Sequence, residues 1–182
     1  KSSSILYKVN VHCTKRTRRS YQYCGKLYNN IGNVYEQKSD HNKALEYYTN
    51  SLSIRLKPLG ENHPGTAVTY DSISAVCESL GDNEKALENY NKALTIELST
   101  LGEDHPDIAI SYSNIDSMYD GKGDYNEALK CYNKSLSIRL KTLGESHPAT
   151  ATCYSNLTYV HDNHGDYNEA LKLNPFPSGW TH

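Results

Sequence analysis

The stretch LGENHPGTAVTYDSI at residues 59–73 recurs twice, as LGEDHPDIAISYSNI at 101–115 and as LGESHPATATCYSNL at 143–157. The interval from one copy to the next is 42 residues both times, from 59 to 101 and from 101 to 143. Self-similarity at a fixed period of this length is typical of solenoids built from one repeated supersecondary unit. The sequence is therefore interpreted first as an array of repeats.

Each 42-residue block predicts two helices separated by a short break. In the second block, apolar residues from Tyr70 through Ile73 to Leu80 are spaced three or four positions apart and mark one face of a first helix. Gly81 and Asp82 interrupt this spacing. A second apolar stripe with helical spacing follows, made of Ala86, Leu87, Tyr90, Ala93, Leu94 and Leu98.

The break between the two helices carries a stop signal and a start signal. In the third block, Gly123 suits the left-handed conformation in which many helices end. Asp124 can accept hydrogen bonds from the N–H groups that open the next helix, and Glu127 completes the pattern of a capping box. The fourth block repeats this pattern with Gly165, Asp166 and Glu169, whereas the first two blocks have Lys43 and Lys85 in place of the glutamate.

The His-Pro pair of the recurring stretch predicts a helix start. Proline has no N–H group and a fixed φ, so it is tolerated at the first position of a helix and not in the interior. A ladder of metal sites is the alternative, but packed helices lie about 10 Å apart and a zinc–histidine bond is about 2 Å long. Equivalent histidines cannot share one ion, so a structural role is predicted. The corners contain Gly60, Gly102 and Gly144, then His63, His105 and His147, then Pro64, Pro106 and Pro148.

The repeat resembles the tetratricopeptide repeat (TPR) family, whose pattern is W-x2-L-G-x2-Y followed by A-x3-F. The first block matches it with Tyr28, Ile31, Gly32 and Tyr35, and then with Ala44 and Tyr48. The period of 42 and the LGExHP loop are similar to the variant in kinesin light chains and nephrocystin-like proteins. The resemblance implies an all-α fold, a right-handed superhelical solenoid of antiparallel helix hairpins.

The register of the repeats divides the chain into three regions. Residues 26–173 are expected to form the TPR array, with three full repeats and a truncated fourth. Residues 1–25 lie outside the register and hold six basic residues and no acidic one, so they are interpreted as a basic arm. Part of 15–25 also suits an extension of the first helix. Residues 174–182 are expected to be an irregular tail.

The bulk composition excludes several classes of protein. The net charge of −2 gives the whole chain no long-range attraction to nucleic acid or acidic lipid. No run of residues approaches the roughly 18 apolar residues that a membrane span needs. Five cysteines are scattered without a C-x-x-C pair, which predicts reduced thiols in an intracellular, cytoplasmic protein.

No pattern in the sequence predicts catalysis, a cofactor or a metal site. The phosphate loop G-x-x-x-x-G-K-[ST], the nucleophile motif G-x-S-x-G and the zinc motif H-E-x-x-H do not occur. The densest group of potential metal ligands is HDNHGD at 161–166, at the end of a first helix. His161 there takes the place of a core tyrosine of other blocks, which favours a structural role. We expect a protein that is not an enzyme.

The remaining class of function is binding. Stacked hairpins leave a concave surface lined by the first helices, and the resemblance implies that a peptide or partner segment lies there. In that family the residue before the Ile or Leu of the pattern often bonds the peptide backbone; it is Asn or Ser in every block here. Helical spacing adds neighbours on the same face. The groove candidates are Asn29, Asn30, Asn33, Asp71, Ser72, Glu78, Asn114, Ser117, Asp120, Asn156 and Tyr159.

The charge of the groove predicts the charge of its ligand. The first helices hold few cations beyond Lys26, Lys38 and Lys122. TPR domains that clamp a terminal carboxylate use Lys and Arg there, so a neutral or basic peptide is expected. Basic residues of the second helices would reverse this if they reached the groove, namely Arg55, Lys57, Lys92, Lys134, Arg139 and Lys141.

Two other functions stay open from the sequence. One is a structural or sensor segment of a larger signalling protein with a nucleotide-binding domain of the NACHT type. The other is nucleic-acid binding through the basic arm, which is the less favoured of the two. A small-molecule substrate and a membrane partner are not expected.

Overall fold

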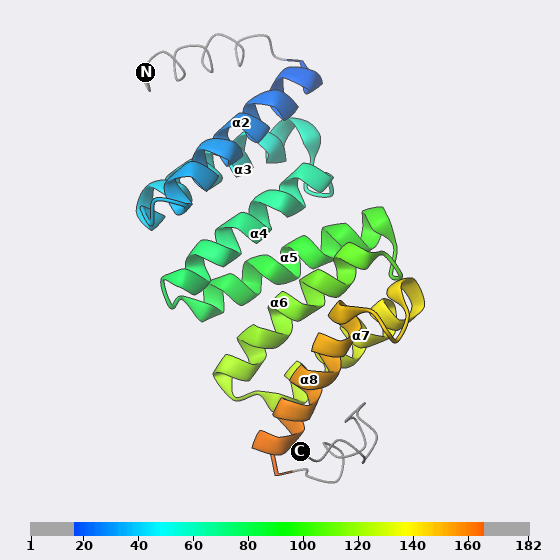
Figure 1. Ribbon diagram of the computed structural model, residues 1–182. Coiled ribbons are helices and arrows are strands. Elements are labelled where there is room, and N and C mark those ends of the chain that lie inside the picture. Colours follow the sequence, from blue (N-terminus) through cyan, green and yellow to red (C-terminus); the bar gives the residue numbers. More distant parts are fainter. Residues whose placement is uncertain (1–16, 166–182) are drawn as a thin grey trace. The chain divides into compact units, whose positions relative to one another are not determined.

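The computed structural model describes residues 17–165, and these form seven α-helices and no strand (Figure 1). The predicted all-α fold is therefore confirmed for this part of the chain. The first helices of the four blocks are α2 (Arg18–Glu36), α4 (Pro64–Ser79), α6 (Pro106–Lys122) and α8 (Pro148–Asn163). The second helices are α3 (His41–Leu59), α5 (Asn83–Leu101) and α7 (Tyr125–Leu143).

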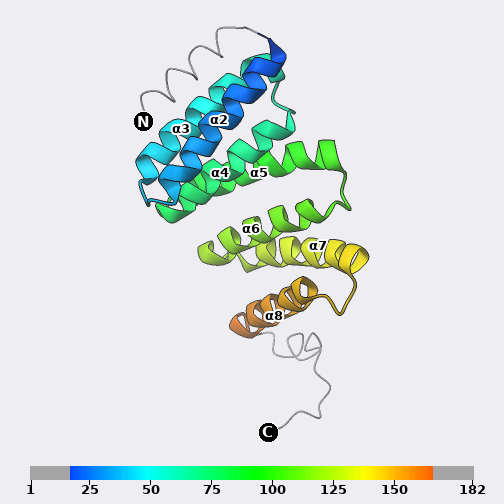
Figure 2. The same ribbon diagram turned by 45° about the horizontal axis from the view of Figure 1, so that its top comes forward.

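The helices pair as antiparallel hairpins within two compact units, residues 1–100 and 101–182. In the first unit α2 packs along α3, α3 and α2 pack against α4, and α5 follows α4 (Figure 1). In the second unit α6 packs along α7, and α7 packs against α8 (Figure 2). Each hairpin is one block of 42 residues, so the predicted repeat is the repeat of the structure.

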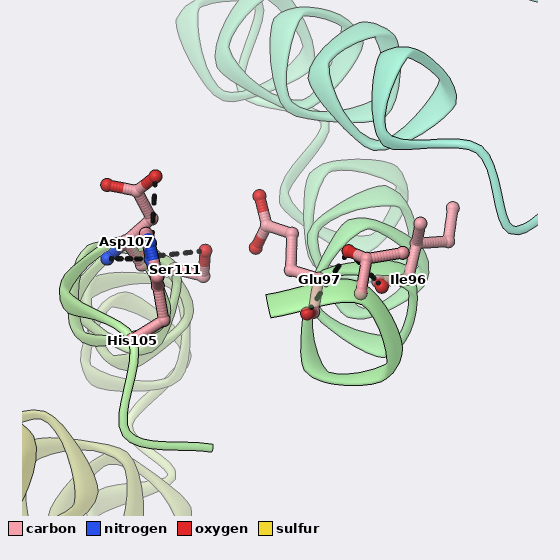
Figure 3. A network of polar contacts seen from close by, with 6 residues as sticks. Ile96, Glu97, His105, Asp107 and Ser111 are labelled. Carbon is pink, nitrogen blue, oxygen red and sulfur yellow. Dashed lines mark hydrogen bonds and ion pairs between the residues drawn. The ribbon is translucent and has the colours of Figure 1, made fainter. Parts of the chain in front are cut away.

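The histidine of each His-Pro corner is the N-cap of the first helix that follows. His63 Nδ1 accepts a hydrogen bond from the Gly65 N–H at 3.0 Å. His105 Nδ1 accepts a hydrogen bond from the Asp107 N–H at 3.2 Å. One turn further on, the Ser111 hydroxyl donates to the Asp107 carbonyl (Figure 3). His147 caps α8 in the same way. The structural role predicted for these histidines is confirmed, and the capping form is the neutral imidazole protonated on Nε2.

An aspartate caps each second helix, but the predicted capping box does not form. Asp40 and Asp124 accept from the N–H groups of Lys43 and Glu127, three residues on. The prediction that Glu127 reaches back was wrong, because its carboxylate pairs with Lys130 instead. The N–H of Asp124 already donates to the Tyr119 carbonyl at 2.9 Å, so no donor is left there for Glu127. Glu169 of the fourth block lies outside the described residues.

The break between first and second helix uses a left-handed residue. Gly81, Gly123 and Gly165 have φ values of 77°, 75° and 82°, as the C-terminal glycine of a helix requires. The first block has Ser39 at the corresponding place, with a φ of 57°. A residue with a Cβ is strained there by roughly 1–2 kcal/mol, and this makes Ser39 a weak point of the first hairpin.

The first helix begins earlier than the repeat register. α2 starts at Arg18, and Thr17 accepts from the Ser20 N–H as its N-cap. Residues 18–25 therefore extend the first helix, one of the two interpretations that the sequence allows. Residues 1–16 and 166–182 lie outside the described part. They include most of the basic arm, on which nucleic-acid binding would depend, and the predicted tail 174–182.

Small residues allow the paired helices to approach closely. Ala44, Ala86 and Ala128 occupy one position of the pattern in α3, α5 and α7, and each is fully buried. Tyr48, one turn further along α3, is also fully buried, and its ring lies against Gly32 of α2. A Cβ at Gly32 would come within 2.4 Å of that ring, so glycine is required by the close approach.

Candidate functional site

A buried tyrosine of the second helix supports polar groups on the face of the first helix. In the first unit the Tyr48 hydroxyl lies 2.5 Å from Glu36 Oε2 and 2.8 Å from Asn33 Oδ1. Its single proton can be donated to one of them at a time. Burial, together with the nearby Glu36 carboxylate, raises the pKa of Tyr48 well above its usual value. The hydroxyl thus remains a proton donor that orients Glu36 and Asn33.

The next hairpin repeats this device. The Tyr90 hydroxyl of α5 donates to Glu78 Oε2 of α4 at 3.2 Å. Burial and the Glu78 charge raise the pKa of Tyr90 as well. Glu36 and Glu78 hold the same position in successive blocks, 42 residues apart. The first unit therefore presents two oriented carboxylates, one from each of its first helices.

The predicted asparagine and serine positions of the first unit divide into buried and exposed groups. Asn29 is buried, 6% exposed, and its amide donates to Ser72 Oγ at 3.3 Å between α2 and α4. Ser72 also donates to the Val68 carbonyl at 2.9 Å. Asn30 and Asn33 are exposed on α2. The side chains open to a ligand on α2 are therefore Asn30 and Asn33, while Asn29 stabilises the helix pair.

Asp71 is a largely buried acid of the first unit. Burial, and next to it the Glu97 carboxylate of α5, raise the pKa of Asp71 to about 7. Its Oδ1 atom is buried without a hydrogen-bond partner. The corresponding residue of the first block is Asn29, which is neutral. These features favour a structural role for Asp71 over direct contact with a ligand.

In the second unit the predicted groove residues lie on α6 and α8. Asn114 and Asp120 are partly exposed and Ser117 is exposed on α6, where the Ser117 hydroxyl donates to the Asn114 carbonyl at 2.9 Å. Asn156 is exposed on α8, and Tyr159 is 61% exposed. An exposed tyrosine offers an apolar ring and a polar end, which suits contact with a partner.

Most basic residues of the second helices are engaged away from the groove positions. Lys92 pairs with Glu88 at 2.6 Å, and Lys141 pairs with Asp104 at 2.8 Å. Lys134 lies over the Tyr112 ring and donates to its hydroxyl. Lys57 is exposed in the last turn of α3, and Arg55 is 6% exposed. The expected scarcity of cations on the first helices is thus not offset by these side chains.

Arg139 of α7 is the exception in the second unit. Its guanidinium donates to Ser113 Oγ at 3.2 Å, a position that helical spacing places beside the groove. It also donates to the Ala149 carbonyl at 3.0 Å and to Cys153 Sγ at 2.9 Å, which ties α8 to α7. A positive charge therefore lies beneath α6. Arg55 holds the same position of the repeat in the first unit, where its buried side chain lies against Gly25 of α2 and Gly65 of α4.

Sequence reasoning missed two kinds of residue. The tyrosines Tyr48 and Tyr90 were assigned only to the core, although a hydroxyl where the family has Phe signals a polar partner. Asp116 takes the place of Gly32 in the third block and is 2% exposed. Burial raises the pKa of Asp116 to about 8. The other blocks have Gly, Ser or Thr at this position, so the acidic side chain of Asp116 was a sequence signal that could have identified the residue.

Residues 17–165 contain no group of three or more His, Cys, Asp or Glu side chains arranged to hold a metal ion. In the predicted cluster at 161–166, His161 Nδ1 is buried without a partner and the His164 ring lies 5.0 Å from that of Tyr125. None of the described helices is long and apolar enough to span a membrane.

The cysteines differ from the expectation of five reduced thiols. Cys77, Cys131 and Cys153 are free, as predicted. Cys24 on α2 is disulfide-bonded, so the prediction was wrong for this residue. The scattered spacing gave no sign of the bond, because pairing depends on the fold and cannot be deduced from sequence spacing.

These hairpins, each built from one block of the sequence, define a helical-repeat protein. The family model "Tetratricopeptide repeat" matches residues 23–97, 80–139 and 117–174. The chain belongs to the tetratricopeptide repeat family. A search of curated protein sequences finds no match.

Solved structures of repeat proteins share the fold. BtubC (BKLC) from P. vanneervenii has a TM-score of 0.84 and 21% identity, over 95% of this chain and 68% of that chain. A putative kinesin light chain of Podosopora anserina with nearly identical TPR-like repeats has a TM-score of 0.75 and 20% identity, over 93% and 80%. The apo form of RapI has a TM-score of 0.74 and 20% identity, over 94% and 47%. The resemblance to kinesin-light-chain-like repeats is thus confirmed at the level of the fold.

Proposed function

We propose that this chain is a non-catalytic scaffold that binds a neutral or basic segment of a partner protein on the exposed face of its first helices. Tetratricopeptide repeats typically serve in protein–protein interaction, and the family match supports this class of function. The more specific part of the proposal is that the exposed face of the first helices binds the segment and that the segment is neutral or basic. The polar groups of the first unit provide its main support.

The observation that carries the proposal is the pair of tyrosine-supported carboxylates. Glu36 and Glu78 lie at one position of successive first helices, and each is fixed from beneath by a buried tyrosine hydroxyl. A fixed side chain loses little conformational entropy when it binds. Two such acceptors suit N–H donors or Lys and Arg side chains of a bound segment.

Neighbouring groups complete this surface without adding positive charge. Asn30 and Asn33 are exposed on α2 and can both donate to and accept from a peptide backbone. Ser72 and Asn29 bond each other between the helices and hold α2 against α4. An acidic peptide would face the carboxylates of Glu36 and Glu78, whereas the exposed lysine of α2, Lys26, lies ten residues before Glu36. The surface therefore favours neutral or basic sequences.

Absence of catalysis and an intracellular setting are parts of the same proposal. The family is generally non-catalytic. The free thiols Cys77, Cys131 and Cys153 support a reducing compartment, whereas the disulfide of Cys24 does not. Burial raises the pKa of Cys77, and it raises that of Cys131 to about 11, so neither thiol is activated as a nucleophile.

A comparison of peptide pools tests the proposal. Fluorescently labelled peptides of equal length, bearing lysine, only neutral residues or glutamate, are titrated with the full chain at low and at high salt. We expect lysine-bearing or neutral peptides to bind, with salt weakening the former. Glu36→Gln and Glu78→Gln should each weaken lysine-peptide binding about tenfold, because a charge-assisted hydrogen bond contributes about 1.5–3 kcal/mol.

The matched control is Glu46→Gln, an exposed glutamate on α3, away from the first-helix face. The affinity of the Glu46→Gln variant for lysine-bearing peptides should equal that of the wild type. Preference for glutamate-bearing peptides, or unchanged lysine-peptide affinity in the double variant of Glu36 and Glu78, would overturn the proposal.

A further inference from the structure

Arg55 of α3 is a buried cation without an anion. Its side chain is 6% exposed, and its Nε atom has no hydrogen-bond partner. Within residues 17–165, no hydrogen bond or ion pair joins Arg55 to another residue. Burial lowers the pKa of Arg55, yet an arginine stays charged in a protein. An unsatisfied buried group of this kind points to an ion or a water molecule bound beside it.

The matching arginine of the second unit has its hydrogen bonds. Arg139 donates to the Ala149 carbonyl at 3.0 Å and to Ser113 Oγ at 3.2 Å. In the first unit the carbonyl that matches Ala149 belongs to Gly65, and it accepts from the Thr69 hydroxyl at 3.0 Å instead. One position of the repeat therefore holds a bonded, structural arginine in the second unit and an unpartnered arginine in the first.

Two glycines let the guanidinium of Arg55 reach the start of α4. A Cβ at Gly25 of α2 would lie 2.6 Å from Arg55 Nε, and a Cβ at Gly65 would overlap Arg55 Nη1. The second unit has Ala109 and Ala149 at these two places, and their Cβ atoms fill the room that the glycines leave. Gly65 is the second residue of α4 and is partly exposed. The guanidinium therefore lies under the first turn of α4, close to the surface.

The start of α4 is a region of positive charge. The N-terminus of this 16-residue helix is the positive end of its dipole. Burial first, and then the charges of Arg55 and Arg18, lower the pKa of His63, so both cations act on this corner. Neither arginine has an ion pair with a carboxylate of residues 17–165. The Gly65 N–H donates to His63 Nδ1, so the free donors at this turn are those of the guanidinium.

The corresponding turn of α6 carries an anion of its own. Asp107 takes the place of Gly65 in the third block. Its carboxylate lies 3.7 Å from His105 Nδ1, and its side chain is 63% exposed (Figure 3). A corner of this type therefore accommodates a carboxylate at the surface. The α4 corner has the cations and lacks the anion.

We propose that the start of α4 binds an oxyanion, a carboxylate or a phosphate group, through the guanidinium of Arg55. Arginine donates two parallel N–H bonds to such groups, and the N-terminus of a helix favours negative charge. The site goes beyond the proposed peptide-binding surface and does not depend on it. Gly65 and Glu78 are 13 residues apart on α4 (65 to 78), about 20 Å along the helix.

Titration with inorganic phosphate and with acetate tests the site. The ¹H–¹⁵N spectrum of the full chain is followed at constant ionic strength, which is held with sodium chloride. We expect the backbone amide signals of Gly65 and Thr66 and the side-chain Nε signal of Arg55 to shift and saturate. Saturation by phosphate alone assigns the site to phosphate groups, and saturation by acetate extends it to carboxylates.

Two variants remove the site in different ways. Arg55→Met removes the charge, and Gly65→Asp supplies the carboxylate that α6 has, which occupies the guanidinium. Each should weaken binding of the saturating anion at least about tenfold, the loss of one charge-assisted hydrogen bond. The matched controls are Lys57→Met, which removes an exposed charge two residues further along α3, and Glu36→Gln, which changes the peptide-binding surface. Both controls should keep the wild-type affinity for the anion.

Two results would overturn the proposal. One is the absence of a saturable shift at Gly65 and Thr66 with both anions. The other is an anion affinity that Arg55→Met and Gly65→Asp leave unchanged. Far-UV circular dichroism checks that each variant has native helix content, and Gly65→Asp decides alone if Arg55→Met has lost it.

Discussion

Asp116 should lower the stability of the second unit at neutral pH, and Asp116→Asn should restore it. The carboxyl is 2% exposed, and its Oδ2 atom has no hydrogen-bond partner. Burial raises the pKa of Asp116 from 3.8 to about 8, although the Tyr132 hydroxyl and the Arg139 charge act in the opposite direction. The folded chain therefore holds a proton that the unfolded chain releases.

The sign of the pH dependence follows from that raised pKa. Stability is fully present below pH 3.8, falls as the pH rises from 3.8 to about 8, and is constant above. Each pH unit in this window costs about 1.4 kcal/mol. The ionisable group therefore costs about 4 kcal/mol at pH 7 and about 1.5 kcal/mol at pH 5. Asparagine keeps the shape of the side chain and removes this dependence.

Urea unfolding of both proteins by circular dichroism, at pH 5 and at pH 8, measures the effect. The stability gained by Asp116→Asn should be larger at pH 8 by about 4 kcal/mol. Asp120→Asn, one turn further on and partly exposed, should change stability by less than about 0.5 kcal/mol at either pH. A gap between wild type and Asp116→Asn that is the same at pH 5 and pH 8 would refute the reasoning. So would an Asp116 carboxyl ¹³C signal that titrates near pH 4.

Three further substitutions have expected outcomes. Ser39→Gly should raise the unfolding free energy by about 1 kcal/mol, because Ser39 has a φ of 57°; an unchanged melting temperature would contradict the assigned strain. Gly32→Ala should lower it by about 1–3 kcal/mol, since the added Cβ would meet the buried Tyr48 ring. Gly121 is a helical glycine with nothing near its Cβ position, so Gly121→Ala should instead raise the unfolding free energy by up to about 1 kcal/mol. A lower unfolding free energy in both alanine variants would argue against a clash specific to Gly32. Burial, then the Arg55 and Arg18 charges, lower the pKa of His63, so its capping contribution of about 1 kcal/mol should be lost as the pH falls below about 6.5. His63→Asn should remove this loss in unfolding curves at pH 5 and pH 7.5, and equal pH dependence in both proteins would count against it.

The corners of the repeat could be predicted from the sequence because they depend on local chemistry. Proline cannot occupy a helix interior, and a positive φ favours glycine, so Pro64 and Gly60 mark a start and an end without any tertiary contact. The capping role of His63 follows from its place before the proline. The same local reasoning failed for Glu127, because a nearby Lys130 and an already bonded N–H group competed with the predicted capping box.

The faces of the helices were harder to predict because burial depends on the neighbouring hairpin. Asn29 and Asn30 are adjacent and equally polar, yet α4 buries the first and leaves the second exposed. Tyr48 fits the aromatic position of the family pattern, and only the packed structure shows its hydroxyl between Asn33 and Glu36. The disulfide of Cys24 likewise reflects proximity in space, which spacing in the sequence does not encode.

The histidine caps give each corner its own spectroscopic label. His63, His105 and His147 each use Nδ1 as an acceptor, so their ring ¹⁵N resonances in a magnetic resonance spectrum should report whether that one turn is intact. Warming or denaturing the chain while following the three signals would show whether the repeats melt together or one after another. The protein thus contains natural reporters of its own cooperativity, spaced one block apart.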